Sequence, residues 1–447
     1  MIKIYDTMTR SLRDFVPLTE NIVNMYVCGP TVYNYIHIGN ARSTVAFDTI
    51  RRYFEYRGYI VNYISNFTDV DDKIIKAANE AGISTKELSD NFIAAFMEDT
   101  AQLGIKPATQ NPRVINYMDE IIAFVSTLID KGFAYVAEGD VYFRVAKSKN
   151  YAKLANKTLE DLEIGASGRT DAEIVRKENP LDFALWKAAK EGEISWDSPW
   201  GPGRPGWHIE CSVMATEILG DTIDIHGGGA DLEFPHHTNE IAQSEAKTGK
   251  TFANYWMHNG FVNVDNEKMS KSLGNFVTVH DMLKTVDGQV LRFFLATQQY
   301  RKPINFTEKA IHDAEVNLKY LKNTHSLPLT EEVSQAELQT YLDAFQAAMD
   351  DDFNTANGVT VLFDMAKWIN SGNYDQTVKD AFEKILQVFG IVFEEEVLDE
   401  DIEKLIEERQ AARANKDFAT ADRIRDELAA QGIKLLDTKE GVRWTRD

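Results

Sequence analysis

The chain contains 447 residues, a length typical of two to four domains. Hydrophobic residues make up 44% of the chain and charged residues 26%, a globular composition that excludes disordered, collagen-like and low-complexity proteins. The formal net charge of −22 argues against broad polyanion binding. Residues 401–447 nevertheless hold 11 acids and 10 bases, a nearly neutral tail that can contact nucleic acid through local patches.

The beginning of the chain has no targeting pattern. The first 20 residues carry charges of both signs, unlike a signal peptide, and no run of about 18 apolar residues occurs anywhere. Two cysteines are too few for a disulfide scaffold. We therefore expect a cytoplasmic protein without a membrane-spanning segment.

The pattern after the first 20 residues predicts a βαβ unit. Residues 22–28 form an apolar strand ended by Gly29-Pro30, residues 39–57 have helical spacing, and residues 59–64 read as a second strand. The carboxyl ends of parallel strands meet at one edge of a sheet, where ligands bind. Cys28 follows the first strand, and Asn66, Thr68 and Asp69 follow the second, so we expect these side chains to converge on one crevice.

The rest of the chain reads as an insertion followed by helices. We expect a helix over 113–131, a hairpin over 135–145, irregular structure to 206, a strand over 222–225 and a helix from about 235. Beyond 306 the chain becomes helical, with a capping box at residues 334–337. An acidic run between 394 and 401 predicts a linker, and two short helices and the segment 441–444 follow it.

One group of side chains has the chemistry of a metal site: Cys28, Cys211, His236, His237 and Glu240. His236 and Glu240 are four residues apart on a predicted helix and therefore project from one face. Thiolate, imidazole and carboxylate together suit zinc. The alternative is two buried free cysteines beside a capping histidine, and the spacing does not decide between the two.

Two further motifs are suited to phosphate. His37-Ile38-Gly39-Asn40 opens the first predicted helix, where free N–H groups and the helix dipole attract anions. Lys268-Met269-Ser270-Lys271-Ser272 lies on a loop, and its two lysines suit a phosphate clamp. The alternatives are an ordinary helix start and an exposed basic turn.

Taken together, these motifs resemble the two signatures of class I aminoacyl-tRNA synthetases. The stretches YVCGPTVYNYIHIGNAR, GRPGWHIECS, HGGGADLEFPHHTNE and KMSKSLGN resemble bacterial cysteinyl-tRNA synthetases, and the resemblance covers essentially the whole chain. It implies an α/β fold: a parallel-sheet Rossmann-type catalytic domain with an inserted domain, followed by a helical bundle and a small C-terminal anticodon-binding domain. The implied divisions are 1–120 with 207–265 for the catalytic domain, 121–206 for the insertion, 266–306 for the KMSKS and stem-contact region, 307–394 for the bundle and 401–447 for the tail.

The resemblance also implies roles for individual residues. The zinc ligands would be Cys28, Cys211, His236 and Glu240. The catalytic residues would be His37, Lys268 and Lys271, and the ATP-binding residues would be His37, Gly39, Asn40, Gly229, Asp231 and Lys271. Thr68 and Trp207 would lie near the amino acid. The first signature commonly ends in histidine, and Asn40 replaces it here. Asparagine can donate a hydrogen bond but cannot carry a positive charge.

The implied activity is that of a cysteine–tRNA ligase. L-cysteine would react with ATP and Mg²⁺ to cysteinyl-adenylate, and the 3′ end of tRNA(Cys) would then accept the cysteinyl group. One Zn²⁺ per subunit would bind the substrate thiolate and reject serine, and the protein would act as a monomer. Trp444, Arg443 and Arg446 are candidates for anticodon contacts, the alternative being a small core with solvated arginines.

Two rival functions share many of these features. A ligase that joins cysteine to a small amine would have the same zinc site and fold, but the long region after Phe306 argues against it. A zinc-containing RNA-binding protein without catalytic activity would not need His37, Lys268 and Lys271.

Overall fold

The computed structural model describes residues 1–166, 174–269, 273–394, 400–438 and 441–446. The chain divides into two compact units, residues 1–392 and 393–447. Among the described residues, no helix has the length and apolar character needed to cross a membrane.

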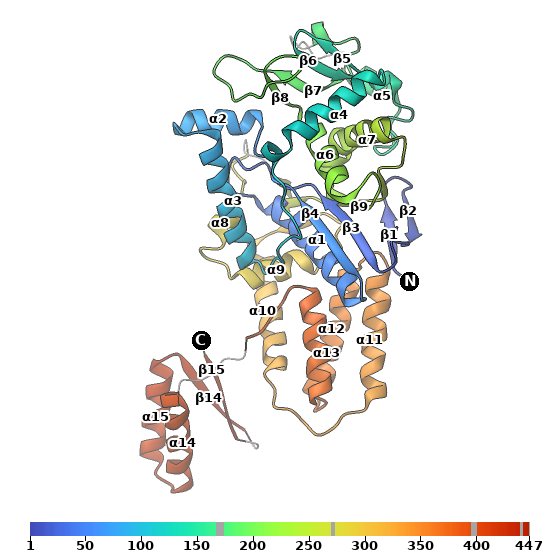
Figure 1. Ribbon diagram of the computed structural model, residues 1–447. Coiled ribbons are helices and arrows are strands. Elements are labelled where there is room, and N and C mark those ends of the chain that lie inside the picture. The colour runs from blue at the N-terminus through green and yellow to red at the C-terminus, as the bar shows by residue number, and fades with distance from the viewer. Residues whose placement is uncertain (167–173, 270–272, 395–399, 439–440, 447) are drawn as a thin grey trace. The chain divides into compact units, whose positions relative to one another are not determined.

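The first unit is built around a four-stranded parallel sheet in the order β10-β9-β3-β4 (Figure 1). Its strands are β3 (Ile22–Val27), β4 (Ile60–Ser65), β9 (Ile223–Gly229) and β10 (Ala253–Asn259). Val27 pairs with Ser65 on one side and with Gly227 on the other. The carboxyl ends of three strands therefore lie side by side, and the predicted α/β class with a parallel sheet is confirmed.

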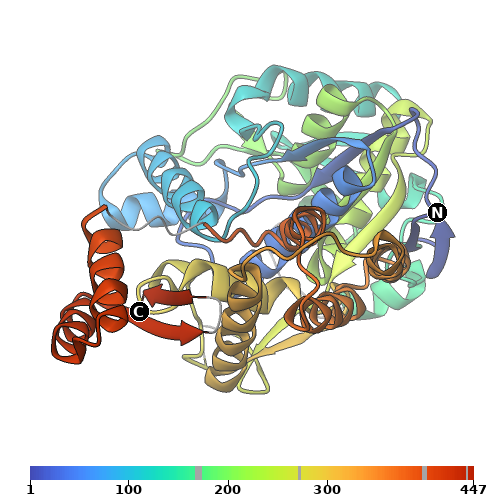
Figure 2. The same cartoon turned by 90° about the horizontal axis from the view of Figure 1, so that it is seen from below.

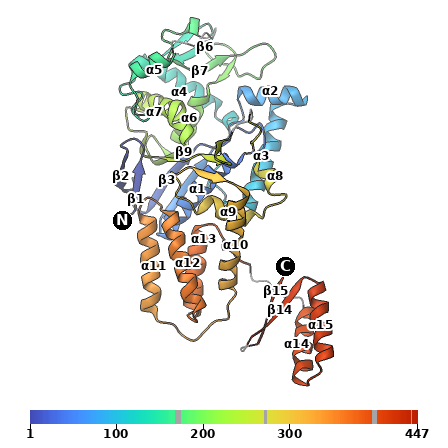
Figure 3. The same cartoon turned by 180° about the vertical axis from the view of Figure 1, so that it is seen from behind.

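Helix α1 (Ile38–Tyr56) connects β3 to β4 and packs on the sheet, where the Phe47 ring lies against Gly227 of β9. Its N-terminus lies at the carboxyl edge of the sheet, as the βαβ pattern predicts. Figure 3 shows the sheet from the opposite side, with α6 (Trp207–Leu219) and α7 (Thr238–Thr248) beside β9.

The hairpin expected over 135–145 is present, and the stretch that follows it to 206, expected to be irregular, also contains regular structure. Helices α2 (Asp72–Ala81), α3 (Thr85–Gln102) and α4 (Met118–Asp130) precede an antiparallel sheet of β5 (Ala134–Ala137), β6 (Asp140–Phe143), β7 (Phe183–Ala188) and β8 (Gly203–Pro205). The sequence FALWKA of β7 alternates too weakly to signal a strand, because Phe183, Leu185 and Trp186 are all buried. The helix expected over 113–131 begins only at Met118, after a single 3₁₀ turn.

Four helices follow a short connecting sheet, and Figure 2 shows them nearly end-on. They are α10 (Glu308–His325), α11 (Gln335–Asp350), α12 (Thr355–Asn370) and α13 (Gln376–Val388). The predicted capping box before α11 is wrong: Ser334 occupies the N-cap position, but its side chain makes no capping hydrogen bond. The helix packs into the bundle through an apolar face, on which Leu338, Phe345 and Met349 are buried.

The second unit has its own small core. Helices α14 (Glu400–Ala414) and α15 (Phe418–Ala430) pack beside the antiparallel pair β14 (Ile433–Thr438) and β15 (Gly441–Arg446). Its buried residues are Ile402, Ile424, Leu428 and Ile433, and Trp444 packs against them. Most of the predicted acidic linker lies outside the described residues.

A buried ion pair joins the sheet to the bundle. Arg292, on α9 (Gly288–Ala296), lies 2.7 Å from the carboxylate of Asp48 on α1 and donates a hydrogen bond to the backbone oxygen of Phe389 at 2.8 Å. Burial opposes ionisation of Asp48, but Arg292 and Arg52 hold the pKa of this carboxyl below its usual value. Gly390 leaves room for the pair, because a Cβ there would lie 2.3 Å from the guanidinium carbon.

Replacing Arg292 with leucine should lower the free energy of unfolding of the first unit by about 3–5 kcal/mol, because Asp48 would lose a buried partner. Urea unfolding followed by circular dichroism measures the change. Lys367→Leu is the matched control, since Lys367 is 70% exposed beside Asp364 and its loss should cost about 0.5 kcal/mol. Equal unfolding midpoints for the two variants would contradict the structural importance of the buried pair.

Candidate functional site

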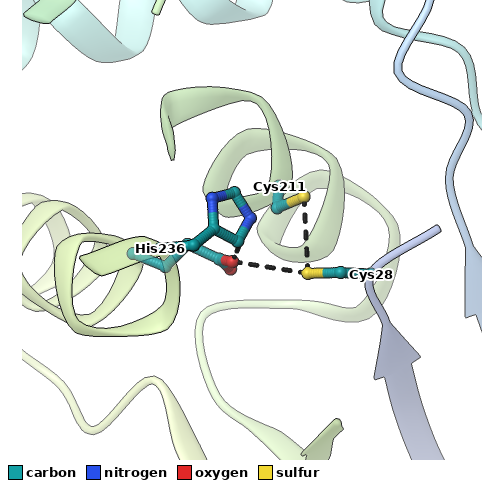
Figure 4. A group of neighbouring side chains, drawn as sticks. Cys28, Cys211 and His236 are labelled. Atoms are coloured by element: carbon teal, nitrogen blue, oxygen red, sulfur yellow. Dashed lines mark hydrogen bonds and ion pairs between the residues drawn. The ribbon is translucent and has the colours of Figure 1, made fainter. Parts of the chain in front are cut away.

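The predicted metal-ligand residues meet at the carboxyl edge of the parallel sheet. Cys28 follows β3, Cys211 lies on α6, His236 lies in the turn before α7, and Glu240 lies on the first turn of α7. Their ligand atoms all fall within 4.8 Å of one another. The two sulfur atoms face each other at 3.7 Å, and Nε2 of His236 lies 2.9 Å from Oε1 of Glu240 (Figure 4).

The group is buried and its charges depend on one another. Burial and the neighbouring sulfur raise the pKa of the Cys28 thiol, while a hydrogen bond from Cys28 lowers the pKa of Cys211 to about 6. Burial opposes a charged His236, but Glu240 and Cys211 outweigh it and raise its pKa to about 10. Burial also opposes ionisation of Glu240, yet His226 and His236 lower its pKa to about 2. A thiolate, an imidazolium and a carboxylate thus compensate one another away from water.

Two more histidines border the same centre. Nε2 of His237 lies 3.3 Å from the sulfur of Cys28, and Nε2 of His226 lies 2.6 Å from Oε2 of Glu240. Cys28, His226, His237 and Glu240 form a second set of ligand atoms within 4.8 Å, which shares two members with the first. His226 was missed by the sequence analysis, although its place before three glycines at the end of β9 is a usable signal.

The buried polar atoms near this centre that have no hydrogen-bond partner among the described residues include Oη of Tyr26 and Oε1 of Glu210. Burial, Cys211 and Cys28 raise the pKa of Tyr26, and burial followed by Cys211 raises that of Glu210. Both residues stand beside predicted ligands in the sequence, Tyr26 two positions before Cys28 and Glu210 directly before Cys211. An additional polar group at this centre could use either atom.

The two residues predicted to lie near the amino acid both border the ligand group. Trp207 is 40% exposed and its indole stacks on the ring of His236, with centroids 4.2 Å apart. Thr68 is buried and its hydroxyl donates to Oε2 of Glu210 at 3.4 Å. An exposed aromatic ring over the buried ligands is suited to covering a small molecule.

The first signature motif forms the N-terminal cap of α1. Nδ1 of His37 accepts a hydrogen bond from the backbone N–H of Asn40, and Oδ1 of Asn40 accepts one from the backbone N–H of His37, both at 3.2 Å. This reciprocal pair is a capping box. Because Nδ1 accepts, the neutral imidazole carries its hydrogen on Nε2. Asn40 therefore fixes the orientation of His37.

Gly39 allows a close approach to this cap. A Cβ at Gly39 would lie 2.9 Å from the His37 ring and 3.6 Å from Cε of Met269. The beginning of the second signature motif therefore lies over the helix start. Lys268 is exposed in the short strand β12 (Glu267–Lys268), with Nζ 5.9 Å from the centroid of the Phe261 ring. Lys271, the other predicted lysine, lies outside the described residues.

The glycine-rich segment lies at the same edge of the sheet. Gly229 ends β9, and Asp231 lies in the 3₁₀ turn that follows. A Cβ at Gly229 would lie 2.4 Å from Oδ1 of Asp231, so these two residues predicted to bind ATP are adjacent. The cap of α1, the glycine run and the ligand group thus all stand where β3 and β9 end.

Three segments of the chain match models of known protein families. Residues 14–316 match the model of the tRNA synthetases class I (C) catalytic domain, residues 344–394 the DALR domain, and residues 395–444 the cysteinyl-tRNA ligase anticodon binding domain. A cysteine–tRNA ligase of Streptococcus thermophilus is 96% identical over the whole of both chains, and one of Streptococcus pyogenes serotype M6 is 83% identical over the same extent. The chain belongs to the cysteine–tRNA ligase family of class I synthetases. The recognised resemblance is confirmed, and the small-amine ligase is not favoured.

Solved structures support the fold. The methionyl-tRNA synthetase of Mycobacterium tuberculosis in complex with methionyl-adenylate has a TM-score of 0.60 at 15% identity, covering 82% of this chain and 89% of that one. The putative arginyl-tRNA synthetase of Campylobacter jejuni has a TM-score of 0.53 at 14% identity, covering 82% and 90%.

Replacing Asn40 with alanine should lower the free energy of unfolding by about 0.5–2 kcal/mol, because the backbone N–H of His37 loses its capping acceptor. Asn40→Asp is the control: it keeps an acceptor oxygen, and an acidic group is favourable at a helix N-terminus. Thermal unfolding of both variants measures the difference. Identical stability of the alanine and aspartate variants would show that the reciprocal cap contributes nothing.

Proposed function

We propose that the chain joins L-cysteine to the 3′ end of tRNA(Cys) in two steps, through a cysteinyl-adenylate formed from ATP. The observation that carries the proposal is the buried group of Cys28, Cys211, His236 and Glu240, in a chain of the cysteine–tRNA ligase family. Sulfur ligands at the base of a crevice suit a thiol substrate. The protein would act as a monomer in the cytoplasm.

We propose further that these four side chains hold one Zn²⁺. The residues fit the ion: two thiols, an imidazole and a carboxylate are a donor set that zinc prefers, and they already lie within 4.8 Å of one another. The partnerless Oη of Tyr26 is buried against the sulfur atoms, where it could hydrogen-bond a metal-bound thiolate. When bound, zinc would act as a Lewis acid toward the thiol of the substrate cysteine. Serine has a hydroxyl in place of this thiol and would bind the ion more weakly. His226 and His237 would hydrogen-bond the ligands Glu240 and Cys28.

The ATP site in this proposal lies over the start of α1. Free N–H groups of the first turn and the helix dipole would attract the phosphates, together with Lys268, Lys271 and Mg²⁺. Nε2–H of His37 would donate to a phosphate oxygen, with the ring held by Asn40. Gly39, Gly229 and Asp231 would border the nucleotide. The carboxylate of cysteine is itself the nucleophile, so the site needs mainly positioning and charge stabilisation.

The amino acid would lie beside the ligand group and next to Trp207. The indole stacks on His236 on one side and is exposed on the other, so it would cover the bound cysteine. Thr68 and Glu210 border the same edge and offer a hydroxyl and a carboxyl for polar groups of the substrate. These contacts would orient the carboxylate of cysteine toward the α-phosphate.

The second unit would bind the anticodon. Trp444 packs against the small core of this unit, which favours a structural role for this residue over base stacking. The side chains of Arg443 and Arg446 lie outside the described residues and stay candidates for contacts with tRNA. We also propose the domain divisions given by the resemblance, with the catalytic domain split by the insertion.

The purified protein should contain about one zinc ion per chain by elemental analysis. Cys211→Ser should lose the ion, because the hydroxyl oxygen is a poorer ligand than the thiolate, while the helical content measured by circular dichroism stays unchanged. Substitution by Co²⁺ adds an independent measurement, since a thiolate-to-cobalt absorption band should disappear in the variant. Fully active protein without any bound metal would contradict the proposed site.

Truncation after Val392 tests the role of the second unit. Every residue assigned to activation lies in the first unit, so cysteine-dependent ATP–pyrophosphate exchange should stay within about twofold of the full-length rate. Charging of tRNA should fall sharply through weaker tRNA binding, with a smaller salt dependence of the remaining binding. Parallel loss of exchange and charging in the folded truncated protein would mean that the tail only stabilises the first unit.

A further inference from the structure

We propose that His280 is a positioning residue for His37: through Asp99 and Tyr35 it holds the segment 276–279 against the start of α1. The inference rests on the proposed role of His37 in binding ATP. His280 belongs to none of the motifs recognised in the sequence, and it lies on the short helix α8 (Val279–Met282).

The backbone on both sides of His37 is bound to this segment. The N–H of Ile38 donates to the backbone oxygen of Val277 at 3.1 Å, and the N–H of Val279 donates to the oxygen of Ile36 at 2.9 Å. His37 and Thr278 thereby form an antiparallel bridge. The ring of Phe276 meets the His37 ring edge-on, with centroids 5.3 Å apart. A shift of this segment would therefore carry His37 with it.

The other side of the segment is fixed by His280. Its ring stacks on Tyr35 with centroids 4.2 Å apart and planes 18° apart, and Tyr35 also meets Phe92 of α3 edge-on at 5.3 Å. Nδ1 of His280 lies 3.1 Å from Oδ1 of Asp99, also on α3. His280 thus joins α3, the residues just before His37 and the segment after Phe276 at a single side chain.

The contact between His280 and Asp99 matters because the Asp99 carboxyl is buried and has few other partners in the described part of the chain. This carboxyl is buried, its Oδ2 has no hydrogen-bond partner among the described residues, and the nearby charged groups Glu98 and Asp281 are acidic. Burial raises the pKa of Asp99, and the hydrogen bond from His280 opposes this effect. Lys284, the nearest lysine on this side, pairs with Asp281 at 2.7 Å. Removing the imidazole would leave Asp99 without its basic partner and release α8 from α3.

A substitution at position 280 should raise the Michaelis constant for ATP and leave that for cysteine unchanged. A small displacement of His37 weakens its contact with a phosphate, whereas the ligand group and Trp207 belong to other elements, α6, α7 and the end of β3. The Michaelis constant for ATP and that for cysteine are therefore expected to respond differently to changes at position 280.

The experiment measures cysteine-dependent ATP–pyrophosphate exchange in the full chain with His280→Phe, which keeps a flat ring against Tyr35 and removes the contact with Asp99. The KM for ATP should rise about tenfold while the KM for cysteine stays within twofold. His280→Arg, which keeps a hydrogen-bond donor and a flat group, should restore the KM for ATP to within about threefold. His312→Phe is the matched control, because His312 is 71% exposed on α10.

A double variant separates positioning from stability. Asp99→Asn combined with His280→Phe removes the buried charge, so its melting temperature should return toward the wild-type value while the KM for ATP stays raised. A purely structural role predicts that both recover together, and that result would overturn the inference. An unchanged KM for ATP in His280→Phe would also overturn it, provided that His37→Ala raises that KM. If His37→Ala has no such effect, the proposed role of His37 fails, and the inference fails with it.

Discussion

The parallel pairing of β3 with both β4 and β9 is the constraint on which the site depends. It places the residues that follow three strands at one edge: Cys28, Thr68 and the glycine run that ends at Gly229. The same geometry brings the N-terminus of α1 to that edge, because a helix that connects two parallel strands must start where the first strand ends. Through this pairing, Cys28 and the start of α1 become neighbours, and α6, α7 and the turn before α7 bring the other three proposed ligands to the same edge.

Burial makes the ligand group chemically selective. A carboxylate, an imidazolium and a thiolate away from water are tolerable only when they compensate one another, as His236, Glu240 and Cys211 do. A divalent cation bound among them would take over that compensation and displace the protons. His226 and His237 contact Glu240 and Cys28 and would thereby add to the affinity of the proposed site for metal.

Sequence patterns predicted the elements that carry a clear period and missed those defined by tertiary contacts. The βαβ unit over residues 22–65 and the helical region after 306 follow from spacing, because one face of each element is buried. In the insertion, the hairpin of β5 and β6 was predicted, but β7 and β8 were missed, since Phe183, Leu185 and Trp186 of β7 are all buried and the strand shows little alternation. Within the site, Cys28 and His236 follow from motif chemistry. Glu210, His226 and His280 did not, because their importance comes from neighbours far away in the sequence.

The position of β3 in the sheet also determines when the catalytic core can form during synthesis. Its partner β4 follows within the same βαβ unit, but β9 begins about 160 residues after β4 ends. Because synthesis proceeds at about 5–20 residues per second, one edge of β3 stays unpaired for roughly 8–30 seconds before β9 has been made. The insertion emerges from the ribosome in that interval, but its buried residues share one apolar cluster with residues of β9, α6 and α7 that are made later. A nascent chain of this length presents an unpaired strand edge, which is a template for pairing with another chain.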